Sequence, residues 1–429
     1  MKLSELLKVI GISSNSSKII NNIRTDTRLI EAGDVFIALR GKNYDGNDFV
    51  YEAIKKGAIA CITDSDSTYD ECVKVEDTYS AMCKIARYIR DKYPVPLIAI
   101  TGSNGKTTTK DLIAHILSFK YNVLSNIGSH NNLIGVSETL FNLNNSIDII
   151  VMELGTNHMG EIEFLSKLCN PDYAVITNIG SSHLEYFKKR KNIFKEKISI
   201  LKGMKQKNLI VNGDDKYLKK TKSYKCGLKR NNKLRAYNIK QDIDKVSFCI
   251  YTDKEYNIVF NNPGIHFIPD ILLAIKTCLD FNIKMKYIVK KIKSFKITEK
   301  RMNYKKIGSS TIINDCYNSS YESFIAGINY LKNIESNKII IIGDILELGK
   351  YSKKIHKKID RKLKQIKNRK VLTIGKYSKY IKGIHFSNNI DLISYLNQID
   401  LDNTFIYIKG SRRMNLDEIS DYLIKRRTI

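Results

Sequence analysis

The sequence lacks the features of a membrane-spanning or disulfide-stabilised protein. None of its apolar runs is long enough to span a bilayer. The N-terminal stretch MKLSELLKVIG includes Glu5 and has no small-residue cleavage site, so we expect neither a signal peptide nor membrane insertion. The eight cysteines are scattered without a Cys-x-x-Cys pair, which argues against a disulfide framework or a zinc site. Together these absences predict a reduced, cytoplasmic protein.

Acidic residues are scarce relative to basic ones, and the 429 residues carry a formal net charge of +28. The excess is zero over residues 1–95, +15 over 96–300 and +13 over 301–429. A nucleic-acid-binding surface would gather positive charge on one face with interleaved aromatics, whereas runs such as KKRKNIFKEK are most simply solvated helix faces. We therefore expect no nucleic-acid partner. A basic cleft would suit a substrate that carries phosphates and carboxylates.

The chain is too long for one typical core, which favours two or three domains, and no repeat or low-complexity linker divides it. Residues 1–94 have balanced charge and short strand-like pieces, and Pro94 and Pro96 indicate a boundary. In residues 95–299 and again in 300–429, apolar strands alternate with helical patterns, as in a parallel sheet covered by helices. The sequence thus predicts an α/β protein of three domains: a small α/β domain, a central parallel-sheet domain with a phosphate-binding loop, and a smaller C-terminal, Rossmann-like α/β domain.

The common phosphate-loop spacing, G-x-x-x-x-G-K-[ST], is also missing, because Ile100 occupies the position of its first glycine. A shorter loop, TGSNGKT at Thr101–Thr107, follows the apolar run Leu97–Ile100 and precedes a helical pattern over Thr107–Leu117. Glycines between a strand and a helix leave backbone N–H groups and the positive end of the helix dipole facing one point, which binds phosphate. An ordinary glycine turn would show the same local pattern, so other segments must decide.

Polar residues follow several other predicted strands, where the ligand sites of such sheets lie. Glu153 ends the strand DIIVMEL, the place where a nucleoside triphosphatase puts a magnesium ligand. His183 closes the cluster GSSH after YAVITNI. Taken singly, a solvated strand end or a surface turn would explain each of them as well. The stretches NDCYNSS, GDILELG and IKGSRRM follow strands of the third segment.

Taken together, these stretches resemble the Mur ligases, the ATP-dependent amide-forming enzymes of peptidoglycan precursor synthesis. That family uses the short loop T-G-x-x-G-K-[TS]. Its further marks here are GSHNNLIGV, MELGTNHMGEI, TNIGSSHLEYF, DCYNSSYES and GDILELG. In the first segment, TDTRLIEAGDVFIALRGKNYDGNDF resembles the family's uridine-nucleotide domain. The resemblance runs in order over nearly the whole chain.

The resemblance implies ATP and two magnesium ions as cofactors. Lys106 would reach the outer phosphates of ATP, Thr107 and Glu153 would bind one magnesium ion, and His183 would bind the second together with a carbamylated Lys197. Spacing from His183 alone selects Lys197 over Lys195. The predicted catalytic residues are Lys106, Glu153, His183 and Lys197, and the phosphate-binding residues are Gly102, Ser103, Asn104, Gly105, Lys106, Thr107 and Thr108.

The resemblance also implies the substrates, UDP-N-acetylmuramoyl-tripeptide and D-alanyl-D-alanine, which a monomeric enzyme would join through an acyl phosphate. In the third segment, Arg301 and Asp315 would approach ATP. The residues expected to contact the other substrates are Asn318, Lys409 and Arg412 on the amino-substrate side, and Asp26, Thr27 and Arg28 on the nucleotide-sugar side.

The chain departs from the family pattern at several positions. The family shows H-N-x-x-N for adenine contact, whereas this chain reads HFIPD from His266 to Asp270, with Phe267 at the second position. Tyr321 replaces a proline, Asn47 replaces a histidine, and FKKRK replaces a glycine-serine turn after His183.

Four other functions compete with this interpretation. A sister ligase that adds a diamino acid carries a D-N-P-R motif, which this sequence lacks. A folate polyglutamate ligase shares the core without a uridine-binding first domain. A basic phosphate-loop protein acting on nucleic acid would need a concentrated basic face. A catalytically dead relative would have no need of Lys106, Glu153 and His183.

Overall fold

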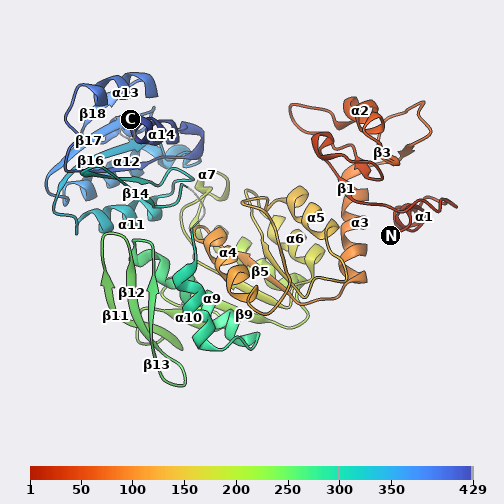
Figure 1. Ribbon diagram of the computed structural model, residues 1–429, viewed down its shortest axis with the longest axis horizontal. Helices are drawn as coiled ribbons and strands as arrows, with labels where there is room; N and C mark the ends of the chain where they lie inside the picture. Colours follow the sequence, from red (N-terminus) through yellow and green to blue (C-terminus); the bar gives the residue numbers. More distant parts are fainter. Residues whose placement is uncertain (298–299, 427–429) are drawn as a thin grey trace.

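The computed structural model describes residues 1–297 and 300–426, and within them the chain forms three β-sheets flanked by helices. Figure 1 shows the first and last parts of the chain at opposite ends of the molecule, both in contact with the central part. This architecture confirms the predicted α/β class with three sheets. The boundaries at 94/95 and 299/300 stay predictions, and residue 299 lies outside the described residues.

The first sheet is small and entirely parallel, in the order β1-β2-β3-β4. Its longest helix begins where the Asp77 carboxylate accepts hydrogen bonds from the backbone N–H groups of Tyr79 and Ser80. In Figure 1 this helix, α3, joins the first sheet to the central part. The elements are α1 (Leu3–Val9), β1 (Ile23–Arg24), β2 (Val35–Ile37), α2 (Val50–Lys55), β3 (Ala60–Thr63), β4 (Cys72–Lys74) and α3 (Thr78–Lys92).

The central sheet has nine strands in the order β13-β12-β11-β10-β9-β8-β5-β7-β6. Strands β5 to β11 pair in parallel, as predicted, whereas β12 and β13 extend the edge as antiparallel strands. The strands are β5 (Leu97–Thr101), β6 (Val123–Ser125), β7 (Ile149–Glu153), β8 (Tyr173–Ile176), β9 (Asn208–Asn212), β10 (Tyr224–Gly227), β11 (Leu234–Gln241), β12 (Val246–Tyr251) and β13 (Glu255–Phe260); the helices are α4 (Lys106–Leu117), α5 (Leu133–Phe141), α6 (Glu161–Cys169), α7 (Leu184–Phe187), α8 (Arg190–Ile198), α9 (Ile268–Asp280) and α10 (Met285–Ser294).

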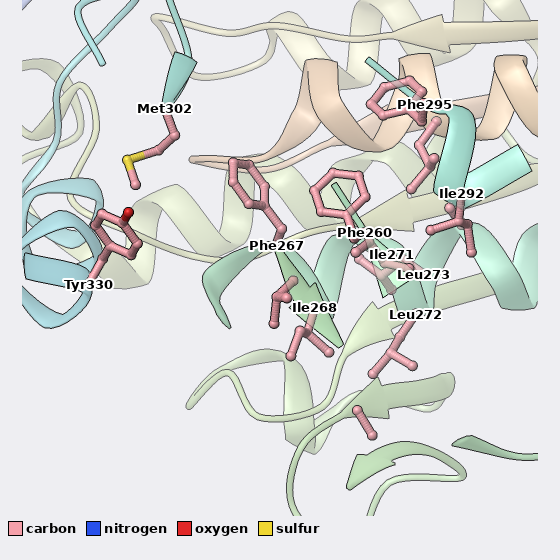
Figure 2. Packing of buried hydrophobic residues seen from close by; sticks show 14 of the residues in the cluster. Phe260, Phe267, Ile268, Ile271, Leu272, Leu273, Ile292, Phe295, Met302 and Tyr330 are labelled. Carbon is pink, nitrogen blue, oxygen red and sulfur yellow. The ribbon is translucent and has the colours of Figure 1, made fainter. Parts of the chain in front are cut away.

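Both faces of the central sheet are covered, so its strands are apolar throughout. In β5, Leu97 and Ala99 belong to the core on one face, whereas Ile98 and Ile100 belong to the core on the other. The second core extends into the third part of the chain, where Met302 and Tyr330 approach the aromatic rings around Phe267 (Figure 2). The two parts therefore share buried apolar contacts.

The third sheet has the order β14-β15-β19-β16-β17-β18 and is parallel except for the β14–β15 hairpin. Its first helix, α11, begins with a capping box in which Ser320 and Ser323 bond to each other's backbone N–H groups. The elements are β14 (Asn303–Ile307), β15 (Ser310–Asn314), α11 (Tyr321–Leu331), β16 (Asn337–Gly343), α12 (Ser352–Leu363), β17 (Arg369–Ile374), β18 (Ile384–Phe386), α13 (Asn389–Asn397), β19 (Thr404–Lys409) and α14 (Asp417–Arg426).

Two further features bear on the expected environment of the protein. Within the described residues, no helix combines the length and apolarity needed to cross a membrane. All eight cysteines are free thiols, four of them buried beyond the reach of solvent in the central and third parts: Cys169, Cys226, Cys278 and Cys316.

Candidate active site at the strand ends

A cleft of about 1470 Å³ lies where the carboxyl ends of the central and third sheets meet. Parallel strands direct all their following loops to one edge, which explains why residues far apart in sequence gather there. Lys42 and Tyr79 bring the first part of the chain to the same cleft. Most single-ligand pockets measure 300–1,000 Å³, so this cleft has room for more than one substrate.

The phosphate loop leads from β5 into α4 at the floor of the cleft. Gly102 has φ +154° and Gly105 has φ +80°, conformations that favour glycine. The Asn178 side chain accepts from the N–H of Asn104, and the Thr177 hydroxyl donates to the carbonyl of Asn104. These bonds fix the loop before any ligand binds.

The helix α4 leaves backbone donors facing the cleft. Its first internal hydrogen bond runs from the N–H of Thr109 to the carbonyl of Gly105, so the N–H groups of residues 106–108 have no acceptor within the helix. Because Leu112, Ile113 and Ile116 are buried, the helix is held firmly against the sheet. The predicted phosphate-binding residues Ser103 to Thr108 all line the cleft, and Gly102 lies directly before them.

Thr107 and Glu153 are in direct contact. The Thr107 hydroxyl donates to a Glu153 carboxylate oxygen over 2.7 Å, and both side chains are buried. The other Glu153 oxygen accepts from the Asn131 amide at 2.6 Å, and Arg301 donates to the Thr107 hydroxyl at 3.0 Å. The structure therefore brings together three predicted site residues from two different domains.

Lys106 lies at the start of α4, in the wall of the same cleft. Burial lowers the pKa of Lys106, while the negative charge of Glu153 acts in the opposite direction. A phosphate bound at the helix start would add negative charge close to this ammonium group and favour its charged form.

Lys195 and Lys197, which the sequence distinguished only by their spacing from His183, differ in burial. Lys197 is 3% exposed, whereas Lys195, on the same helix α8, points into solvent. Burial, and after it the positive charge of Lys106, lower the pKa of Lys197 well below its usual range. Next to Lys197, the buried Glu196 carboxylate accepts from the N–H groups of Gly160 and Ile162 and so fixes α8 against the start of α6.

His183 stands directly before α7 with a left-handed backbone, φ +56°. Its Nδ1 lies 2.6 Å from a carboxylate oxygen of Glu347, which lies in the loop after β16. The contact with His183 lowers the pKa of Glu347. Both side chains line the cleft.

Asp315 and Lys409, predicted to meet different substrates, are paired with each other. Their charged groups lie 2.6 Å apart, and Lys409 is 1% exposed. The same Asp315 oxygen accepts from the Tyr407 hydroxyl at 2.8 Å, and its second oxygen accepts from the N–H of Met302 at 3.3 Å. Because Met302 follows Arg301, the pair also fixes the bend before β14 that brings Arg301 to the phosphate loop.

The remaining predicted residues divide into two groups. Asn318 and Arg412 are exposed and line the cleft, where the Arg412 guanidinium lies 5.4 Å from the Tyr317 ring. Asp26, Thr27 and Arg28 form a separate turn on the first sheet and do not line the cleft. Asp26 caps this turn and pairs with Arg28, whose side chain is 85% exposed.

The segment that departs from the family pattern also lies in the cleft. The Asp270 carboxylate packs closely against the phosphate loop. A Cβ atom at Gly105 would lie 2.4 Å from an Asp270 carboxylate oxygen. Burial raises the pKa of Asp270 well above its usual range, and burial lowers the pKa of His266 to about 4. Burial therefore disfavours the charged forms of both side chains, which line the cleft.

The donor set fits magnesium better than a transition metal. Over residues 1–297 and 300–426, no three His, Cys, Asp or Glu side chains are grouped to hold a metal ion by themselves. Hydroxyl and carboxylate oxygens, here Thr107 and Glu153, are magnesium ligands that leave positions for water and phosphate oxygens. The second predicted site would combine His183 with Lys197, which offers an anionic ligand only if it is carbamylated.

Sequence reasoning missed several residues that shape this site. Asn131 and Asn178 lie within the quoted stretches GSHNNLIGV and TNIGSSHLEYF but carried no assigned role. Glu322 accepts from both the N–H and the hydroxyl of Ser181 and pairs with Arg190 at 3.1 Å. These contacts join segments that are far apart in the sequence. They could be identified only after the fold had placed the two segments side by side.

The positive charge is distributed less evenly than the segment totals suggest. Residues 350–382 contain 14 Lys or Arg and a single acidic residue, Asp360. Their excess positive charge of +13 equals that of the whole segment 301–429. The lysines of α12 in this stretch are exposed, and its apolar positions Ile355, Ile359 and Leu363 pack inward. The helix is therefore a solvated amphipathic element, as predicted.

Comparison with known proteins agrees with the geometry. Residues 100–278 match the Mur ligase middle domain, and residues 19–92 match the catalytic domain of the Mur ligase family. The chain is 35% identical over 449 residues to the UDP-N-acetylmuramoyl-tripeptide–D-alanyl-D-alanine ligase of Buchnera aphidicola subsp. Baizongia pistaciae (strain Bp), covering 99% of this chain and 98% of that one. The ligase of the same name from Bacillus subtilis (strain 168) is 32% identical over 433 residues, covering 95% and 94%.

Solved structures give the same result for the fold. MurF from Acinetobacter baumannii superposes with a TM-score of 0.91 at 26% identity, covering 99% of this chain and 98% of that one. MurF from Thermotoga maritima, in complex with ADP, gives a TM-score of 0.88 at 24% identity, covering 95% and 98%. With its relatives matched over nearly their whole length, this chain belongs to the Mur ligase family.

Proposed function

We propose that this chain joins D-alanyl-D-alanine to UDP-N-acetylmuramoyl-tripeptide at the expense of ATP (EC 6.3.2.10), making the pentapeptide precursor of peptidoglycan. The full-length relatives in Buchnera and Bacillus carry this activity in their names. The observation that carries the proposal is the buried contact of Thr107 with Glu153 at the phosphate loop, completed by Arg301 from the bend before β14. ATP and a UDP-linked peptide are cytoplasmic compounds, so we place the enzyme in the cytoplasm.

The first step activates a carboxylate. The terminal carboxylate of the tripeptide attacks the γ-phosphorus of ATP, a new O–P bond forms, the bond to the bridging oxygen breaks, and ADP leaves. Lys106 and the free N–H groups at the start of α4 stabilise the charge on the transferred group. Arg301, which donates to the Thr107 hydroxyl, would approach the same phosphates. Positioning and charge neutralisation carry this step, and no side chain forms a covalent bond.

Thr107 and Glu153 would hold one magnesium ion, since their oxygens already share a hydrogen bond. Such an ion neutralises phosphate charge when bound. Asn131 keeps the Glu153 carboxylate in place through its 2.6 Å hydrogen bond.

His183 and a carbamylated Lys197 would hold a second ion. Carbamylation requires a neutral amine, and burial of Lys197 favours that form. The amine nitrogen bonds to the carbon of carbon dioxide and releases one proton, which converts the side chain into an anion near the cation Lys106. Exposed Lys195 meets none of these conditions.

The second step makes the amide. The free amine of D-alanyl-D-alanine attacks the acyl carbon, and the tetrahedral intermediate expels phosphate as the amine loses its proton. Asn318 and Arg412 are available in the cleft to bind this dipeptide, whereas Lys409 already pairs with Asp315. Contact between the third and central sheets around the cleft would exclude water, which otherwise hydrolyses the acyl phosphate.

The first sheet would bind the uridine nucleotide at Asp26, Thr27 and Arg28, outside the cleft. Lys42 and Tyr79, which line the cleft on the side of the first sheet, would then border the attached peptide. Mass spectrometry of the reaction tests the proposal: purified protein, ATP and D-alanyl-D-alanine are combined with the tripeptide carrying lysine or diaminopimelate at its third position. Pentapeptide product from either tripeptide supports the function, and ATP hydrolysis without any ligated product contradicts it.

A further inference from the structure

The motif GDILELG carries an acidic residue, Glu347, that the reaction above does not use. It follows β16 in a loop held by several hydrogen bonds. The Asp344 carboxylate accepts from the N–H groups of Tyr377 and Ser378, and the Ser411 hydroxyl accepts from the N–H of Leu346. The loop is therefore rigid and presents Glu347 in a fixed direction.

Glu347 and its partner both have unfavourable backbone conformations. Glu347 has φ +62° and His183 has φ +56°, a region that non-glycine residues seldom adopt. Such conformations persist only where the surroundings hold them, and they concentrate at functional sites. Here two of them face each other across the boundary between the third and central parts of the chain.

Glu347 makes two contacts with the turn that carries His183. A Glu347 carboxylate oxygen lies 2.6 Å from His183 Nδ1, and the Glu347 carbonyl accepts from the N–H of Glu185 at 3.1 Å. Close by, the Tyr351 hydroxyl donates to the carbonyl of Lys188 at 3.3 Å. Figure 1 shows α7, the helix between these residues, extending from the central part toward the third. Residues of the third domain therefore hold the turn that carries His183 through one ion pair and two hydrogen bonds.

We propose that Glu347 is a positioning residue, which orients His183 when the third domain closes over the phosphate loop. A carboxylate 2.6 Å from Nδ1 favours a proton on that nitrogen and leaves the lone pair on Nε2, the arrangement in which histidine binds a metal ion. Closure of the third domain would then bring Glu347 to His183 and complete the phosphoryl-transfer site in the same movement. The proposal rests on the role assigned to His183 above.

If the His183–Glu347 ion pair served only to stabilise the fold, loss of Glu347 would lower the thermal unfolding midpoint. The His183 and Glu347 side chains are 23% and 40% exposed, and ion pairs at such sites contribute little to stability. Loss of Glu347 should therefore leave the thermal unfolding midpoint nearly unchanged and act on the active site instead.

The test compares Glu347→Ala and Glu347→Gln with the control Glu185→Gln, which removes an exposed charge from the same turn. Three quantities are measured: kcat and the KM for ATP, Mn²⁺ affinity in the presence of ADP by electron paramagnetic resonance, and the radius of gyration with ATP by small-angle X-ray scattering. For Glu347→Ala we expect kcat and Mn²⁺ affinity to fall about 10- to 100-fold, with a larger radius. Glu347→Gln should lose less, because its amide oxygen can take the place of the carboxylate oxygen beside Nδ1, and Glu185→Gln should match the wild type.

Wild-type kcat and Mn²⁺ affinity in Glu347→Ala would overturn the proposal, as would equal losses in Glu185→Gln. If Glu347→Ala unfolds without a cooperative transition and is therefore not properly folded, the same criteria are applied to Glu347→Gln. Failure of the proposed function is distinguishable: the wild type would then make no pentapeptide, while Mn²⁺ affinity and radius would still respond to Glu347.

Discussion

The buried Lys197 lies near the phosphate-loop Lys106, and burial together with that neighbouring positive charge lowers the pKa of Lys197. A free ammonium at this place would repel a metal ion, whereas a carbamate would attract one. Lys197→Ala should therefore reduce kcat about 100-fold, and Lys197→Glu should restore part of the activity by supplying a carboxylate. Bicarbonate should activate protein depleted of carbon dioxide.

Lys195→Ala is the matched control for Lys197, since it removes an exposed lysine from the same helix. It should keep nearly full activity in the same steady-state assay. A crippling effect of Lys195→Ala with a mild effect of Lys197→Ala would show that the wrong lysine has been assigned.

Lys106→Ala should abolish ligation while the protein stays folded. Lys106 lines the cleft at the start of α4 and supports no buried ion pair in the described structure. Its loss removes charge stabilisation from the transferred phosphoryl group, for which we expect at least a 100-fold lower kcat with an unchanged circular dichroism melting curve. Near wild-type turnover would refute the phosphate-loop assignment.

Asp315→Ala separates a structural role from an ATP-binding role. It leaves the buried Lys409 charge unpaired, which should lower the free energy of unfolding by about 3–5 kcal/mol. In the double variant Asp315→Ala/Lys409→Met, most of this stability should return, as measured by urea unfolding. If Asp315 also binds ATP, the KM for ATP stays raised in the double variant; a wild-type KM there would leave Asp315 only the structural role.

Lys188→Gly should stabilise the protein by about 1 kcal/mol. Lys188 has φ +63° in the FKKRK turn, where the family has a glycine-serine turn, and glycine adopts positive φ without strain. Lys189→Gly is the control, because Lys189 is extended at φ −139° and should gain nothing. Thermal unfolding of both variants decides, and equal stability of Lys188→Gly and Lys189→Gly would contradict the assignment of strain.

The basic stretch 350–382 should bind nucleic acid only weakly. Its charges lie on solvated faces such as that of α12, so binding to duplex or single-stranded DNA should be electrostatic and vanish near physiological salt. Fluorescence anisotropy over a salt series measures this. Tight, sequence-selective binding at physiological salt would mean that the chain has a nucleic-acid partner.

Local patterns were sufficient to predict much of the fold. The run Leu97–Ile100 became β5, and the periodicity over Thr107–Leu117 became α4, since burial on both faces and helical spacing leave direct traces in the sequence. The site could be anticipated only where a motif concentrates its residues, as at Lys106 and Thr107.

Contacts between distant segments could not be predicted in this way. Asp315 and Lys409 are 94 residues apart and became partners because β15 and β19 are neighbours in the third sheet. Glu347 and His183 meet because two domains approach each other, which no local pattern records. Burial also distinguishes Lys197 from Lys195, a difference that their positions on one helix leave open without the tertiary fold.

The central claim is that the tripeptide carboxylate is phosphorylated by ATP before the amide forms. Tripeptide substrate with ¹⁸O in its terminal carboxylate, incubated with the enzyme, ATP and D-alanyl-D-alanine, tests it by mass spectrometry of the released phosphate. We predict that each phosphate carries one ¹⁸O, because the acyl-phosphate bridging oxygen leaves with it. Unlabelled phosphate accompanying pentapeptide product would contradict the account.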